Sequence, residues 1–241
     1  MLIIDKNHVK KFETIKKLFL SKTELPEQAN WKSQTNNDIW LKMITQVIVV
    51  GSSTPAHRFN KRPDLQQQVS YNKLIEIASQ EALERTINQV LRAVGTRYAS
   101  SDMSKCRKTK ALAHNLQILK GFKEGPKGLL MKLSELNGGS SDRQKIRYLM
   151  KNFKYMQSKS ARDYLMELGV IQNAIALDVR IRTILTKAGI NLPKEFASNH
   201  KLYDQIEKEL LTHICIPLGL SGVEFDRMLY QHYEDILTIL N

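Results

Sequence analysis

The sequence predicts an all-α protein, folded as one large domain or as two packed helical subdomains. Apolar residues recur at spacings of three and four along most of the chain, and the alternating pattern of strands is scarce. Glycine, proline and short polar runs interrupt the periodic segments, which indicates short helices joined by short turns. With 241 residues and 42% hydrophobic composition, the chain can bury a proper core.

The first periodic run is His8–Ser21, where apolar residues form one face of a helix. The second is Asp38–Val50, which begins at a plausible N-cap, Asp38, and carries an apolar stripe. The turn sequence Gly51–Pro55 ends it.

Three further runs lie in the middle of the chain. Ser70–Val94 is long enough for two short helices meeting near Ser79. Lys105–Leu119 and Gly128–Leu136 follow, and Asn137–Gly139 is expected to end the last of them.

The C-terminal part begins with a helix over Ser141–Asn152. A second helix begins near Lys159 and ends at Gly169, and a third spans Leu177–Ala188. Short helices with proline breaks continue to a final one over Val223–Leu240.

The chain is strongly basic, with 37 Lys and Arg against 24 Asp and Glu and a net charge of +13. Such a charge favours a polyanionic partner, with nucleic acid first and an anionic membrane surface second. The two cysteines, Cys106 and Cys215, are too far apart in sequence for a disulfide framework or a metal cluster, and the histidines show no metal-ligand spacing. We therefore expect no metal, no cofactor and an intracellular location.

No segment has the length of a signal peptide or a membrane span. The longest apolar stretch, Val47–Val50, is far shorter than the roughly 20 residues that cross a bilayer. We expect a monomer located in the cytoplasm or nucleoid, without membrane association.

Lys159 and Asp178 are the candidate catalytic pair. Lys159 stands at the start of one amphipathic helix, and Asp178 follows 19 positions later at the start of the next. An amine with a carboxylate returned to it by a short turn suits a lysine nucleophile. Each residue also has an ordinary interpretation, a solvated surface lysine and a helix N-cap, and the N-cap role is compatible with catalysis.

The stretch from Arg147 to Ile184 resembles the helix-hairpin-helix DNA glycosylase superfamily, which includes endonuclease III and the 8-oxoguanine DNA glycosylases. Tyr155-Met-Gln-Ser-Lys-Ser-Ala161 corresponds to the hairpin with its lysine, and Leu177-Asp-Val-Arg-Ile181 corresponds to the segment with the acid. Ala161–Gly169 is most similar to the compact, archaeal-type 8-oxoguanine glycosylases. More weakly, Ile39–Thr54 and Gly95–Tyr98 resemble the early helix with its DNA-facing turn and a basic loop.

The resemblance implies a base-excision repair enzyme that acts on duplex DNA containing a damaged base. Such an enzyme extrudes the damaged nucleotide into a pocket. The amine of Lys159 then attacks C1′, displaces an oxidised purine such as 8-oxoguanine, and forms a Schiff base that allows β-elimination. Asp178 stabilises the positive charge that develops on the sugar and takes part in proton transfer. Lys154 and Arg162 are expected to help keep Lys159 neutral.

The resemblance also implies a domain division with the active-site cleft between two subdomains. Residues 1–50 and 172–241 are expected to form one subdomain, and residues 51–171 the other, with the hairpin at about 142–169. The hairpin departs from the family at two positions, because Tyr155 and Gln157 stand where glycines are usual. These residues reach positive φ less easily than glycine, so we expect a reshaped hairpin or a different grip on DNA.

Further candidates come from charge, turn chemistry and aromatic content. The expected DNA contacts are Ser52, Ser53, Thr54, Arg58, Lys105, Arg107, Lys108, Tyr155, Gln157, Ser158 and Arg180. The expected base-pocket residues are Trp40, Phe225, Asp226 and Tyr230.

Two alternatives remain open from the sequence. A glycosylase without lyase activity would use Asp178 to activate water on alkylated bases, with Lys159 as a phosphate contact. A non-enzymatic helical module would bind any duplex through its charge.

Overall fold

The computed structural model describes residues 2–136 and 141–240, and within these ranges the secondary structure is helical, without strands. The predicted all-α class is confirmed. The chain forms two compact units, one of residues 29–164 and one of residues 1–28 and 165–241. We call them the central unit and the terminal unit. The expected helix end at Asn137–Gly139 lies outside the described residues.

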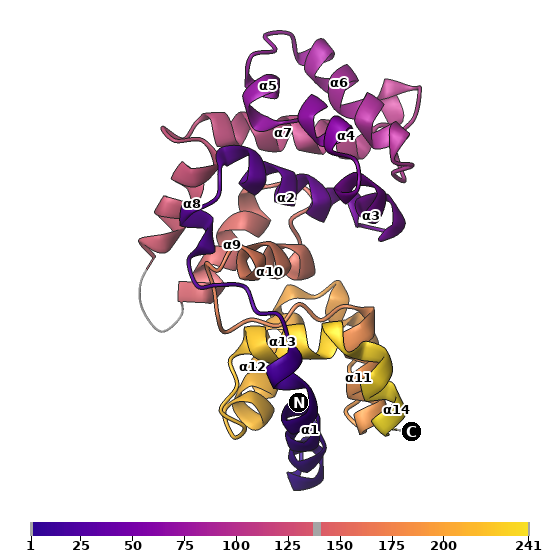
Figure 1. Ribbon diagram of the computed structural model, residues 1–241, viewed down its shortest axis with the longest axis vertical. Coiled ribbons are helices and arrows are strands. Elements are labelled where there is room, and N and C mark those ends of the chain that lie inside the picture. The colour runs from indigo at the N-terminus through magenta and orange to yellow at the C-terminus, as the bar shows by residue number, and fades with distance from the viewer. Residues whose placement is uncertain (1, 137–140, 241) are drawn as a thin grey trace. The chain divides into compact units, whose positions relative to one another are not determined.

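The central unit contains the helices from α2 to the start of α10 (Figure 1). Their bounds are α2 Asn36–Ile48, α3 Thr54–Asn60, α4 Pro63–Gln68, α5 Tyr71–Ile75, α6 Gln80–Ala93, α7 Arg107–Lys120, α8 Pro126–Ser134, α9 Ser141–Asn152 and α10 Ser158–Glu167. The long run predicted over Ser70–Val94 is two helices, and Ser79 is the N-cap of the second, as the sequence indicated. The sequence did not predict α3 and α4. Helix α3 begins at Thr54, within the expected turn sequence, and has Pro55 in its first turn, whereas α4 begins at Pro63.

Helix α2 is the centre of this unit. Its apolar stripe is fully buried, and it packs against α3, α5, α7 and α8. Trp40 is among the buried residues, and its indole N–H donates to the carbonyl of Val69 at 2.9 Å. Residues 29–50 therefore belong to the central unit, whereas we had expected from the sequence that residues 1–50 would join the C-terminal residues in one subdomain.

The start of α2 differs by a turn from the prediction. Thr35, not Asp38, is the N-cap, and its hydroxyl accepts from the Asp38 backbone N–H at 3.2 Å. Asp38 is the third residue of the helix, and its carboxylate in turn accepts a hydrogen bond from the Thr35 N–H at 2.8 Å. The two residues thus form a capping box, in which each satisfies a donor of the other.

Lys108, which we expected from the sequence to contact DNA, instead forms hydrogen bonds with the end of α2. Its side chain is fully buried, and its ammonium donates to the carbonyls of Ile48 at 2.9 Å and Val50 at 2.7 Å. Carbonyls at a helix C-terminus lack partners within the helix, so a buried cation suits this position. Lys108 is a structural residue that cannot reach a phosphate without unfolding its surroundings.

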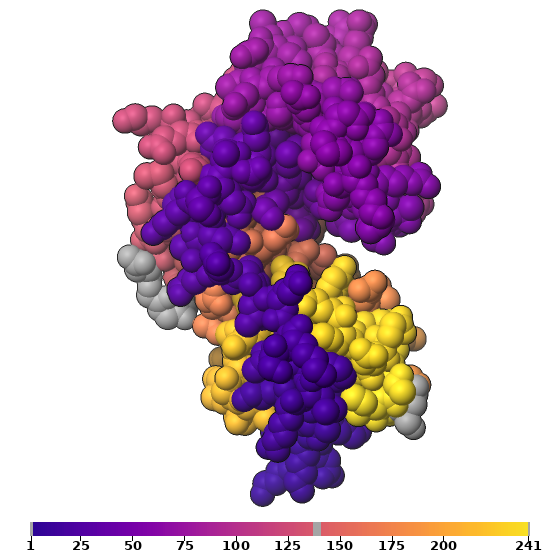
Figure 2. Space-filling model, viewed as in Figure 1, coloured from indigo at the N-terminus to yellow at the C-terminus, as the bar shows by residue number. Residues whose placement is uncertain are grey.

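The terminal unit combines the N-terminal helix with the last third of the chain. Its helices are α1 Lys6–Phe19, α11 Val179–Ala188, α12 His200–Leu210, α13 Gly222–Gln231 and α14 Tyr233–Leu240. Figure 2 shows the indigo N-terminal segment lying against the yellow C-terminal helices, and the rings of Phe12 and Phe225 meet at 5.3 Å in the core. The single final helix predicted over Val223–Leu240 is divided at His232 into α13 and α14.

Among the described residues, no helix is both long and apolar enough to span a membrane.

The buried Lys108 gives a stability prediction. Burial, with Arg97 nearby, lowers the pKa of Lys108 to about 8 from 10.5. Between these pH values the unfolded chain keeps the proton that the folded chain has lost, so this group makes stability rise with pH. We expect the free energy of unfolding of the wild type, relative to Lys108→Met, to increase from pH 8 to pH 10.

Urea denaturation of both proteins at several pH values measures this difference. At pH 7 we also expect Lys108→Met to be less stable by about 1–3 kcal/mol, because two buried carbonyls lose their donor. If the free energy of unfolding of the wild type, relative to Lys108→Met, decreased as pH rises, the lowered pKa of Lys108 would be contradicted.

Candidate functional site

The predicted helix-hairpin-helix is present as α9, a turn over residues 153–157, and α10. Tyr155 lies in this turn with φ of 62°, in the left-handed region that glycine enters without strain. The hairpin therefore keeps its left-handed residue although a tyrosine occupies the position. Gln157 is not among the described residues with positive φ, so a glycine is not required there.

Asn115 of α7 holds this turn from beneath. Its side chain is fully buried, donates to the carbonyl of Lys154 at 3.0 Å, and accepts from the backbone N–H of Lys154 at 2.8 Å. Ser160, in the first turn of α10, also bonds to the hairpin turn. Its hydroxyl donates to the Tyr155 carbonyl at 2.8 Å and accepts from the Gln157 N–H at 2.9 Å. These bonds fix the strained residue and the first turn of α10 together.

Lys159 stands in that first turn, and its side chain is 35% exposed. Its ammonium donates to the carboxylate of Asp163, one helical turn along, at 3.0 Å. Gln46, a buried residue of α2, donates to the same carboxylate oxygen at 2.9 Å. Asp163 therefore anchors Lys159. It was not among the candidate residues from the sequence, although an acid four positions after a lysine on a helix was an available signal.

The two cations expected near Lys159 have different environments. Arg162 is fully buried and donates to the Ser158 carbonyl at 2.9 Å. Lys154 is exposed in the hairpin turn.

Asp178 is the N-cap of α11, and its carboxylate accepts from the Ile181 N–H at 3.0 Å. The side chain is partly exposed, so the capping role leaves it accessible.

The segment before Asp178 is buried but not helical, and buried side chains satisfy its backbone. The N–H groups of residues 175, 176 and 177 donate to Glu207 at 2.8 Å, Asp226 at 2.6 Å and the Tyr203 hydroxyl at 2.7 Å. The Tyr203 hydroxyl itself donates to the Ile175 carbonyl at 3.1 Å. These hydrogen bonds fix the backbone of residues 175–177 and thereby the position of Asp178 at the start of α11.

The base-pocket candidates therefore need correction. Trp40 and Phe225 are fully buried core residues and present no ring face to a ligand. Asp226 is 2% exposed and holds the backbone of Ala176. Tyr230 alone is accessible, at 40%, and the guanidinium of Arg180 lies 4.7 Å from its ring centre.

Most of the DNA-contact candidates other than Lys108 lie at the surface. Ser158 is the exception at 3% exposed, and Tyr155 is half-buried. The exposed ones are Ser52, Ser53, Thr54, Arg58, Lys105, Arg107, Gln157 and Arg180. Lys105 already pairs with Asp102 at 3.2 Å, in an exposed ion pair that costs little to exchange for a phosphate.

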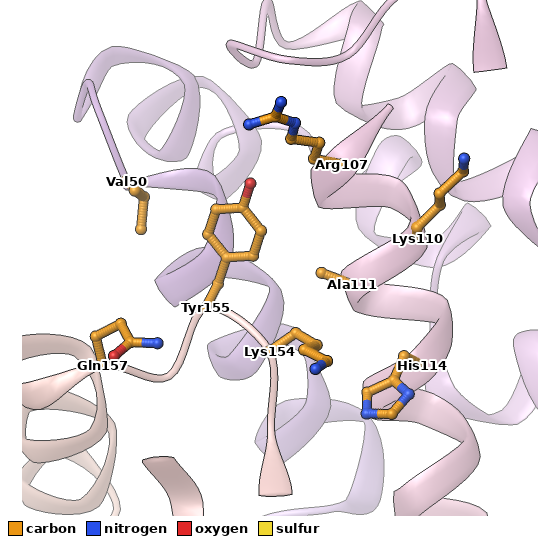
Figure 3. Close-up of a pocket in the computed structure, with 8 residues that line it drawn as sticks. All are labelled: Val50, Arg107, Lys110, Ala111, His114, Lys154, Tyr155 and Gln157. Atoms are coloured by element: carbon orange, nitrogen blue, oxygen red, sulfur yellow. The ribbon is translucent and has the colours of Figure 1, made fainter. Parts of the chain in front are cut away.

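A pocket opens between α7 and the hairpin turn, within the central unit (Figure 3). Its lining residues are Val50, Arg107, Lys110, Ala111, His114, Lys154, Tyr155 and Gln157. Burial raises the pKa of the Tyr155 phenol, opposed by Arg107, so the phenol keeps its proton at neutral pH. Arg107, Lys110, Ala111 and His114 recur at helical spacing, which was the available sequence signal.

Comparison with known proteins identifies the fold. No protein-family model matches the chain. No curated protein matches it by sequence either. Among solved structures, the 8-oxoguanine DNA glycosylase of Methanocaldococcus jannaschii has 16% identity and a TM-score of 0.65 over 94% of this chain and 96% of its own. The 8-oxoguanine DNA glycosylase of Thermotoga maritima has 18% identity and a TM-score of 0.61, with 92% of each chain covered.

The Methanocaldococcus jannaschii 8-oxoguanine glycosylase/lyase in complex with a 15mer DNA containing 8-oxoguanine is also similar, with 14% identity and a TM-score of 0.63 over 94% of this chain and 97% of its own. At these identities the likeness establishes the fold alone. The all-α architecture predicted from the sequence resemblance is thus the architecture of 8-oxoguanine DNA glycosylases.

The hydrogen bonds of the Tyr203 hydroxyl to the segment before Asp178 allow a prediction about stability. Tyr203→Phe leaves the Leu177 N–H and the Ile175 carbonyl without their partner, so we expect a loss of about 1–3 kcal/mol in the free energy of unfolding. Tyr233→Phe, which removes a hydroxyl from a half-buried ring of the same unit, is the control and should change stability by less than about 0.5 kcal/mol. Equal effects in the two variants, measured by urea denaturation, would contradict the network's role.

Proposed function

We propose that this protein is a DNA glycosylase with AP lyase activity that excises an oxidised purine, 8-oxoguanine in the first instance, from duplex DNA. The observation that carries the proposal is Lys159. Its side chain is 35% exposed and lies in the first turn of the second helix of a helix-hairpin-helix, in a fold shared over more than nine-tenths of the chain with 8-oxoguanine DNA glycosylases.

The environment of Lys159 supports a nucleophilic role. Its amine is held at a fixed place by Asp163, which Gln46 in turn orients. The ammonium passes a proton to the Asp163 carboxylate at 3.0 Å, and the neutral amine then attacks C1′ of the sugar. The C1′–N bond breaks, its electron pair leaves with the base, and the base takes up a proton.

The lysine nitrogen then loses a proton, the C1′–O4′ bond breaks, and O4′ takes up a proton, which opens the sugar ring and leaves a Schiff base between Lys159 and C1′. This Schiff base accounts for the lyase step. The iminium acidifies C2′, loss of a C2′ proton drives elimination of the 3′ phosphate, and hydrolysis then releases the amine. Asp178 stabilises the positive charge on the sugar as the glycosidic bond breaks. Lys159 belongs to the central unit and Asp178 to the terminal unit.

DNA binding is supported by charge. The net charge of +13 favours a polyanion, and exposed cations such as Arg58, Arg107 and Arg180 can neutralise phosphates. A duplex containing a damaged base is the proposed partner, as in the complex of the Methanocaldococcus jannaschii enzyme.

The ion pair of Lys159 with Asp163 also favours a second candidate. An ammonium stabilised by a carboxylate can act as a phosphate contact, and Asp178 would then activate water in a glycosylase without lyase activity. The two functions differ in whether a covalent enzyme–DNA intermediate forms.

Borohydride trapping separates them. We expect the wild type to become covalently linked to a duplex containing 8-oxoguanine, and Lys159→Gln to form no adduct while still binding the duplex. Lys151→Gln, an exposed lysine of α9, is the matched control and should be trapped like the wild type. Base release that persists in Lys159→Gln without any wild-type adduct would favour the second candidate, and no release from a panel of lesions would refute both.

Asp163 gives a second kinetic prediction. Asp163→Asn keeps the shape of the side chain but removes the proton acceptor, so we expect single-turnover base release to slow by about 10²-fold or more. Without this acceptor the amine must lose its proton to solvent, and the remaining rate should increase with pH more steeply than that of the wild type. An unchanged rate and pH profile would remove Asp163 from the mechanism.

A further inference from the structure

The pocket beside the hairpin is large enough for a nucleotide. Its volume is about 640 Å³, within the range of roughly 300–1,000 Å³ typical of small-molecule sites. One wall is the face of α7 that carries Arg107, Lys110, Ala111 and His114. The opposite wall is the hairpin turn with Tyr155 (Figure 3).

The pocket is cationic. Arg107, Lys110 and Lys154 line it together with His114, and its lining residues include no carboxylate. Arg107 is also the first residue of α7, a helix of 14 residues whose N-cap, Cys106, makes no capping hydrogen bond with its side chain. The helix dipole and the charges of Arg107 and Lys110 therefore favour an anion at this end of the pocket.

Tyr155 gives the pocket an aromatic wall. Its ring stands in the opening between Val50 and Ala111. The left-handed backbone that places it there has φ of 62° and is strained for tyrosine, and the buried Asn115 maintains it. A glycine would adopt this backbone without strain but would leave the pocket open on that side.

We propose that this pocket receives one unstacked nucleotide of the bound DNA, with its base against the ring of Tyr155 and its phosphate on Arg107 and Lys110. An aromatic face beside convergent cations matches a base attached to a phosphate. The inference rests on the proposed DNA-binding function and adds a site separate from Lys159.

Neighbouring residues give the strand a path into the pocket. Val50 is followed by the exposed turn Gly51–Thr54, and the side chain of Arg97 lies beside Gly51. The guanidinium of Arg97 is 5.0 Å from the ring centre of Tyr98, which is 47% exposed and also left-handed, with φ of 66°. Cations and aromatic rings therefore continue from the pocket along the surface of the central unit.

Photocrosslinking tests the contact directly. Duplexes containing 8-oxoguanine carry 5-iodouracil at one position at a time on either strand, and near-ultraviolet light couples it to an aromatic ring stacked on it. We expect Tyr155 to be the crosslinked residue, identified by mass spectrometry, at one or two positions. Crosslinks confined to other residues, or none at any position, would overturn the proposal.

Variants test the energetic contribution. Tyr155→Phe keeps the ring and should bind like the wild type, whereas Tyr155→Asn suits the left-handed backbone, lacks the ring, and should weaken duplex binding about tenfold or more. Arg107→Gln should reduce the slope of log K against log salt by about 0.9. Arg85→Gln, an exposed arginine of α6 paired with Glu81, is the control and should leave the slope unchanged.

The design separates this site from catalysis. Lys159→Gln should still crosslink through Tyr155, because stacking of a base on the Tyr155 ring does not require the amine. Loss of catalysis in Lys159→Gln with Tyr155 crosslinking intact supports both proposals. Equal binding of the Phe and Asn variants overturns the pocket alone.

Discussion

The two hydrogen bonds between Asn115 and the backbone of Lys154 are the interaction on which the candidate site depends. They fix the hairpin turn on α7, hold Tyr155 in a left-handed conformation, and so set the direction in which α10 leaves with Lys159. Because Asn115 is fully buried, solvent cannot replace these bonds, and losing one leaves polar groups unsatisfied at a cost of about 1–3 kcal/mol. The same turn forms one wall of the cationic pocket, so one buried amide orients both the amine and the pocket.

In the terminal unit, too, buried polar side chains hold a non-helical segment in place through hydrogen bonds to its backbone. The chain before Asp178 makes no helix, and the buried Glu207, Asp226 and Tyr203 satisfy its backbone. Gly222 allows this packing, because a side chain there would lie 2.6 Å from the backbone of Ala174. Each candidate catalytic residue therefore follows a non-helical segment that buried polar side chains hold in place, while its own functional group remains partly exposed.

Much of the helical architecture could be predicted from the sequence, since helical periodicity and turn residues are local. Ser79 separates two helices, and Gly169 follows the end of α10 with a left-handed backbone, as the pattern indicated. The roles of Lys108 and Trp40 could not be predicted, because burial depends on residues far away in sequence: Lys108 meets the end of α2, and Trp40 meets Val69. Charge alone suggested phosphate contact for Lys108, and aromatic character alone suggested stacking for Trp40. The contact of Asp163 with Gln46 could not be predicted, because Gln46 lies on a helix more than a hundred positions earlier.

The central claim is that the amine of Lys159 performs the chemistry. Peptide mapping of the borohydride-reduced, nuclease-treated complex of the wild-type protein with 8-oxoguanine duplex tests it most directly. The account predicts that the sugar remnant is found on Lys159, in the peptide that contains the start of α10. A remnant on Lys154, Lys110 or the N-terminal amine, with Lys159 unmodified, would contradict it.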